Sequence, residues 1–159
     1  MGKVVTSYDL GDTWGPPRLA LSQFTVEEVR RFWPQLEEML DQLQHTWRYW
    51  TKDNIYQALM RGQLQMWGVG PPPRATLILL TSVDVYSAMK VLTVVWAAGT
   101  FDDKMIPLVD ATFEDYAQLN GCDEIEVRGR LGWTAKLRPI GFRSETVTYV
   151  RKVKSNKMN

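Results

Sequence analysis

Two carboxylates on a short alternating segment are the side chains best suited to acid–base chemistry. Glu124 and Glu126 lie within residues 123–128, where polar and apolar residues alternate as in a β-strand. A positioned carboxylate can accept a proton from a reacting group. Both alternate with Ile125, so they point to the opposite face of the strand. Two interpretations stay open: a general base, or solvated strand carboxylates without a catalytic role.

Nucleophilic and metal chemistry have weaker support. Cys122 is the single cysteine, and the single histidine, His45, is far from it in the sequence. A cysteine nucleophile needs a group that lowers its pKa, so we expect Cys122 to lie in or beside the core. His45 near a helix end is expected to cap or to pack. The sequence shows no metal-ligand cluster with credible spacing. One cysteine cannot form an internal disulfide, which fits a reducing compartment.

A glycine turn is the candidate ligand-binding loop. Ala97, Ala98, Gly99 and Thr100 follow an apolar strand and precede a predicted helix. Glycine allows close backbone approach, and a helix N-terminus attracts anions. The next residues include an acidic pair at positions 102–103, and each like charge a few ångströms from an anion costs on the order of 1 kcal/mol. The turn is therefore a weak candidate.

The elements that would position these residues form an α+β chain. A strand at 91–96, a helix at 101–120 and a strand at 123–128 predict a βαβ crossover, because two strands joined through a helix pair in parallel. Thr25 and Glu28 predict a capping box at the start of a helix over 25–46. Pro34 should kink or break that helix near Trp33. Further strands are expected at 18–24, 63–69, 75–81 and 145–153, a helix at 52–60, a short helix at 131–137 and a turn at 82–84. Together they predict a mixed sheet of about six strands with flanking helices.

Length and charge limit the class of protein. A chain of 159 residues is most simply one domain, which we place at 18–153, with an N-terminal arm at 1–17 and a basic tail at 154–159. The net charge of +1 gives no general attraction to nucleic acid or membrane. The longest apolar run, 75–80, is too short to span a membrane. We expect no signal peptide.

The order of elements over 18–153 resembles the acyl-CoA N-acyltransferase (GNAT) fold. The most specific part is Gly-Cys-Asp-Glu-Ile-Glu-Val-Arg-Gly-Arg-Leu-Gly-Trp at 121–133, followed by Leu-Arg-Pro-Ile-Gly-Phe at 137–142. It is similar to the corresponding part of small GNAT-like proteins encoded by tailed bacteriophages.

That resemblance implies an acetyl-CoA site at 97–100, where the family normally has Arg/Gln-x-x-Gly-x-Gly/Ala. Here one glycine remains, no arginine precedes it, and Asp102 and Asp103 stand where the pyrophosphate would bind. The family's base would be Glu124 or Glu126. Its tyrosine acid is replaced by Trp133, with Tyr149 a more distant substitute. The implied cofactor site is degenerate.

Three functions follow. The first is a non-catalytic structural or accessory protein of a bacteriophage virion, in the virion or host cytoplasm, contacting other virion proteins or copies of itself. The alternative is an acetyl-CoA-dependent N-acetyltransferase with an atypical donor site. The third is a nucleic-acid-binding accessory protein, which the near-zero net charge disfavours.

Two groups of side chains could form interaction surfaces, and each group has an alternative explanation. Basic residues gather around the last predicted helix and the tail; each can belong to a phosphate-binding or acid-binding patch or to a solvated face. These are Arg128, Arg130, Arg138, Arg143, Arg151, Lys152, Lys154 and Lys157. An aromatic group can dock a partner or lie beneath the sheet. Its members are Trp47, Tyr49, Trp50 and Trp67.

Overall fold

A computed structural model describes residues 5–7, 20–43, 50–129, 131–145 and 148–154. Two compact units divide the chain, residues 1–129 and residues 130–159. Within the second, described residues form η3 (Leu131–Trp133), α4 (Thr134–Leu137) and η4 (Arg138–Ile140). The boundary after Gly129 falls inside the predicted domain 18–153, and the domain limits themselves stay a prediction.

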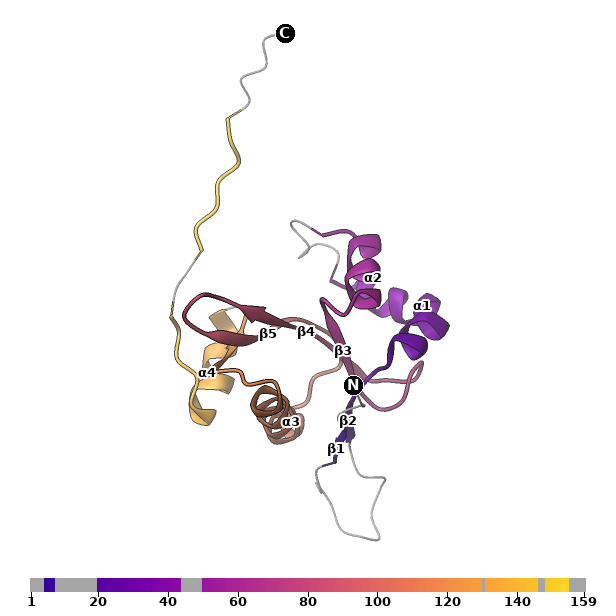
Figure 1. The fold of residues 1–159 in the computed structure, drawn as a ribbon, viewed down its shortest axis with the longest axis horizontal. Helices are drawn as coiled ribbons and strands as arrows, with labels where there is room; N and C mark the ends of the chain where they lie inside the picture. The colour runs from indigo at the N-terminus through magenta and orange to yellow at the C-terminus, as the bar shows by residue number, and fades with distance from the viewer. Residues whose placement is uncertain (1–4, 8–19, 44–49, 130, 146–147, 155–159) are drawn as a thin grey trace. The chain divides into compact units, whose positions relative to one another are not determined.

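The first unit is built on a six-stranded sheet in the order β1-β2-β3-β4-β5-β6 (Figure 1). Its strands are β1 (Val5–Ser7), β2 (Ala20–Gln23), β3 (Gln65–Val69), β4 (Leu77–Val85), β5 (Lys90–Gly99) and β6 (Glu124–Val127). Neighbouring strands from β1 to β5 are antiparallel, and β5 pairs with β6 in parallel. The chain passes from β5 to β6 through α3 (Ile106–Leu119). The predicted mixed sheet and its βαβ crossover are therefore confirmed.

Local sequence signals explain the helices before β3. Helix α1 (Val26–Asp41) begins with the predicted capping box: the Glu28 amide donates to Thr25 Oγ1 at 3.1 Å, and the Thr25 amide donates to Glu28 Oε1 at 2.9 Å. Helix α2 (Lys52–Met60) has the bounds that its apolar spacing predicts. Of the two alternatives predicted at Pro34, the break near Trp33 is wrong, because α1 continues through Pro34; the kink stays a prediction. Proline removes one helical hydrogen bond. Packing of buried side chains before and after it, Val29, Leu36 and Leu40, stabilises the helix.

Two apolar cores lie on the two faces of the sheet. One joins side chains of α1 and α2 to the sheet, including Leu36, Leu40, Ile55, Met66, Ile78 and Leu80. The other joins α3 to the opposite face, including Leu21, Trp67, Leu79, Leu92, Leu108 and Phe113. Figure 1 shows α1 and α2 on one side of the strands and α3 on the other. No helix in the described part of the chain is long and apolar enough to cross a membrane.

Strand β1 lies inside the segment 1–17, whose assignment as an arm stays a prediction. Two other sequence predictions need correction. The predicted turn at 82–84 is wrong, because β4 continues to Val85, where the Asp84 carboxylate accepts from Thr93 Oγ1 on β5 at 2.8 Å. This hydrogen bond joins a side chain of β4 to a side chain of β5. The predicted strand at 145–153 is also wrong for its described residues, which form neither strand nor helix.

Candidate functional site

Strand β6 pairs with only the first part of β5. Residues 91–94 pair with residues 124–127, and the last contact is the Arg128 amide donating to the Val94 carbonyl at 3.0 Å. Strand β5 then continues to Gly99, paired with β4 alone. Among the described residues, the other edge of this half of β5 has no strand neighbour. Its outward backbone groups can bind an extended ligand.

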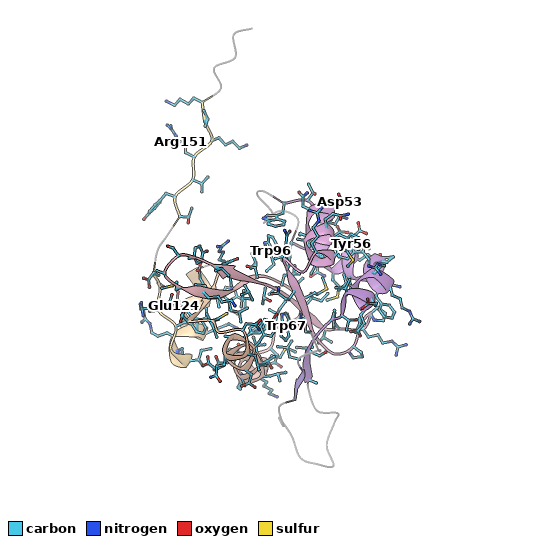
Figure 2. All side chains as sticks on the ribbon, in the orientation of Figure 1. Asp53, Tyr56, Trp67, Trp96, Glu124 and Arg151 are labelled. Carbon is cyan, nitrogen blue, oxygen red and sulfur yellow. The ribbon has the colours of Figure 1, made fainter. Side chains whose placement is uncertain are left out.

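A β-bulge lies where the two strands separate. Thr81 pairs with Val94 and Leu80 pairs with Trp96, so Val95 is the extra residue. Val95 and Trp96 consequently both pack against the core beneath α1 and α2. The Trp96 ring meets that of Trp50 edge-on, with centroids 5.7 Å apart. Figure 2 shows Trp96 near α2. This bulge could not be predicted from the sequence, because it depends on the register of pairing with β4.

The predicted glycine turn is the end of strand β5, where it contacts β4. Ala97, Ala98 and Gly99 are the last residues of β5, paired with β4. Gly99 has a φ of +107°, and a Cβ there would lie 2.3 Å from the Thr76 carbonyl oxygen. The Thr100 amide donates to the same oxygen at 2.8 Å. The backbone at Thr76 thus approaches Gly99 closely. This approach accounts for the glycine, and no ligand is needed to explain it.

The chain's own groups also bind the amides before α3. Asp102 accepts from the Lys104 amide through its side chain at 3.0 Å and from the Met105 amide through its carbonyl at 2.8 Å. The Ile106 amide is bound within the 3-10 turn η2 (Asp103–Met105). Pro107 has no amide hydrogen and stands at the start of α3. Few donors remain for a pyrophosphate, and the Asp102 carboxylate would repel one.

The candidate bases lie on the face of β6 that the sequence predicts. Glu124 and Glu126 are exposed, whereas Ile125 and Val127 pack against the core beneath α3. Glu126 forms a 3.5 Å ion pair with Arg128, and both side chains are about half exposed. An exposed pair of this kind contributes little stability. The structure leaves the catalytic role of both carboxylates a prediction.

The remaining chemical candidates are Cys122, Tyr149 and His45. Cys122 is partly buried, and that burial raises the pKa of its thiol, with Lys90 opposing the effect and Asp123 adding to it. A raised pKa keeps the thiol protonated at neutral pH, contrary to what a nucleophile needs. Tyr149 belongs to the second compact unit and is 91 % exposed. His45 lies outside the described residues. The described residues hold no group of three or more His, Cys, Asp and Glu side chains that could bind a metal.

The aromatic group divides between core and surface. Trp67 is fully buried: its indole N–H donates to Thr81 Oγ1 at 2.9 Å, and its ring meets those of Phe113 and Tyr116 edge-on. Trp50 is 37 % exposed. Figure 2 shows Trp67 and Trp96 on their separate strands, β3 and β5, which contribute them to the two different cores. Trp47 and Tyr49 lie outside the described residues.

Some of the basic residues form ion pairs with neighbouring carboxylates. Arg128 pairs with Glu126, and Arg143 pairs with Glu145 at 3.1 Å. Arg138, Arg151, Lys152 and Lys154 are exposed. Arg130 and Lys157 lie outside the described residues. Whether these residues form one patch stays a prediction.

Comparison with known proteins identifies the fold. No protein-family model matches the sequence, and no curated protein matches it. Solved structures do match. An acetyltransferase of Trypanosoma brucei is 13 % identical, with a TM-score of 0.60 over 85 % of this chain and 99 % of that one. An aminoglycoside acetyltransferase from an uncultured soil metagenomic sample is 13 % identical, with a TM-score of 0.59 over 86 % and 97 %. A ribosomal-protein-alanine N-acetyltransferase from Brucella melitensis biovar Abortus is 11 % identical, with a TM-score of 0.57 over 84 % and 99 %. This chain therefore has the GNAT fold.

Proposed function

We propose that this chain is a GNAT-fold protein without acyltransferase activity that serves as a structural or accessory component. The observation that carries the proposal is the start of α3, where Asp102 binds the amides of Lys104 and Met105. A coenzyme A pyrophosphate would have to displace that carboxylate and overcome its charge. The glycine of the turn contacts Thr76 of its own chain. A fold alone does not imply an activity, and the site decides.

The setting we propose is a bacteriophage virion. It is supported by the resemblance of residues 121–133 and 137–142 to small GNAT-like proteins of tailed phages. The partners would be other virion proteins or further copies of this chain, in the virion or the host cytoplasm. The neighbours of this chain in purified particles, identified by crosslinking and mass spectrometry, test this part. Absence of the protein from the particles contradicts it.

Coenzyme A binding tests the main proposal directly. We expect no heat of binding when coenzyme A or acetyl-CoA is titrated into the full chain by calorimetry. Micromolar affinity together with turnover on any amine would refute the proposal.

A gain-of-binding variant tests whether Asp102 is the obstacle. Replacing Asp102 by Ala and Asp103 by Asn removes two negative charges and frees the Lys104 amide. We expect this variant to bind coenzyme A more tightly than the wild-type chain. Glu38→Gln with Asp115→Asn removes two charges at exposed positions on α1 and α3, away from the start of α3, and is the matched control. Equal binding by all three proteins would show that the cap does not exclude the pyrophosphate.

The second candidate is an acetyl-CoA-dependent N-acetyltransferase. The free edge of β5 after Val94 favours it, because that edge can bind the extended arm of coenzyme A. The names of the matched solved structures also favour it over the first candidate. Glu124 or Glu126 would be the base and Tyr149 a candidate acid. Acetyl transfer that is lost in Glu124→Gln or Glu126→Gln, with the fold intact, would establish this function; absence of transfer to a panel of amines counts against it.

A further inference from the structure

The C-terminal segment has the sequence of a strand and lacks a strand's partner. Residues 148–153 read Thr-Tyr-Val-Arg-Lys-Val, rich in the β-branched and aromatic types that favour strands. The structure assigns them neither strand nor helix, and Figure 1 draws them without an arrow. Tyr149 and Val153 are each 91 % exposed, and Val150 is 48 % exposed. Such a run of exposed large apolar side chains is typical of an interaction segment.

Strand β6 is an open edge of the sheet. It is last in the strand order and pairs only with β5 among the described residues. The N–H and C=O groups of a strand point alternately to its two edges. Those of β6 that point away from β5 have no strand partner among the described residues. An edge of this kind accepts an added strand through main-chain hydrogen bonds.

Charge makes the two segments complementary. Glu124 and Glu126 are exposed on β6, and Asp123 precedes them. Residues 148–154 contain Arg151, Lys152 and Lys154 and no acidic residue. Opposite charges on facing strands stabilise a pair, and like charges destabilise it.

We propose that residues 148–153 add as a strand to the β6 edge of a second copy of this chain. The register that fits places Tyr149 and Val153 on the side of Ile125 and Val127. The same alternation turns Lys152 to the side of Glu124 and Glu126. A reciprocal exchange, in which each copy's segment pairs with the other copy's edge, uses both surfaces and gives a symmetric dimer. The inference concerns self-association and does not depend on whether the chain is an acyltransferase.

Charge reversal in the full-length chain tests the pairing. Sedimentation velocity over a range of concentrations measures the dimer dissociation constant. We expect the wild-type chain to dimerise. Glu124→Lys with Glu126→Lys should raise the dissociation constant about tenfold, because it turns cross-strand pairs repulsive at both β6 edges of the dimer. Adding Lys152→Glu and Lys154→Glu, which alternate to the same side as positions 124 and 126, restores the attraction and is expected to recover dimerisation. This recovery distinguishes lost pairing from misfolding.

Two further measurements complete the test. Glu38→Lys with Asp115→Lys makes the same charge change at exposed positions on α1 and α3, and is expected to dimerise like the wild-type chain. Hydrogen exchange should show the amides of residues 148–153 protected only in the dimer. A wild-type chain that is monomeric up to its solubility limit overturns the proposal. A dimer indifferent to both charge reversals, or a monomer with this segment already protected, overturns it as well.

Discussion

Replacement of Gly99 by alanine tests whether this glycine belongs to the sheet or to a ligand. The alanine would keep a φ of +107°, and its Cβ would lie 2.3 Å from the Thr76 carbonyl oxygen and 3.2 Å from Leu77 Cα. A positive φ costs an L-residue about 1–2 kcal/mol. The contacted atoms belong to backbone, so relief means moving β4 and weakening the hydrogen bond from the Thr100 amide, worth about 1 kcal/mol. We expect a loss of roughly 3 kcal/mol in the free energy of unfolding, measured by urea denaturation. In a chain of this size that lowers the melting temperature by about 6–12 °C.

Gly121 provides the matched control. It too has a positive φ, +66°, but a Cβ there would meet nothing within 4 Å. Gly121→Ala should therefore cost only the backbone term, about 1 kcal/mol. The difference between the two variants isolates the contact with Thr76. If both lose the same stability, the close approach is not what requires glycine at position 99, and a ligand becomes the better explanation.

Three further predictions concern the cores and the thiol. Trp67→Phe removes the N–H that binds Thr81 and some packing volume, so it should lower the free energy of unfolding by about 2 kcal/mol. Burial, with the charge of Glu114 adding to it, raises the pKa of Asp110. A carboxyl with a raised folded pKa stabilises most below its unfolded pKa and loses that contribution as pH rises, so Asp110→Asn should be the more stable protein at neutral pH and not in acid. Cys122 should react with iodoacetamide more slowly than free cysteine at neutral pH and faster as pH rises, because its pKa is raised.

Short-range signals were enough for the elements that they define. Thr25 and Glu28 lie three residues apart, and their reciprocal bonds start α1 where the pattern predicts. The apolar spacing of α2 gives its bounds from Lys52 to Met60. The β-branched and apolar residues at 91–96 predict the strand that the structure shows as β5. These features depend on neighbours that the sequence itself places close together.

Features that depend on pairing between distant segments were out of reach. The extension of β4 through Asp84 depends on Thr93 of the facing strand. The bulge at Val95 depends on the register with Leu80 and Thr81. The segment 148–153 has a strand's composition, but a strand forms only against a partner, which composition does not supply.

The turn at residues 97–100 shows what the structure adds to a sequence motif. Sequence alone identifies one glycine and an acidic pair, and makes the turn a weak candidate for a ligand site. The structure adds an internal role for two of these residues, because Gly99 approaches Thr76 and Asp102 binds the amide of Lys104. Gly99 and Asp102 thus each have an internal partner. Restoring a donor site would require removing the cap and accepting its cost in stability, about 1 kcal/mol for an N-cap aspartate. The Asp102→Ala, Asp103→Asn variant should therefore be less stable than the wild-type chain even if it gains affinity for coenzyme A.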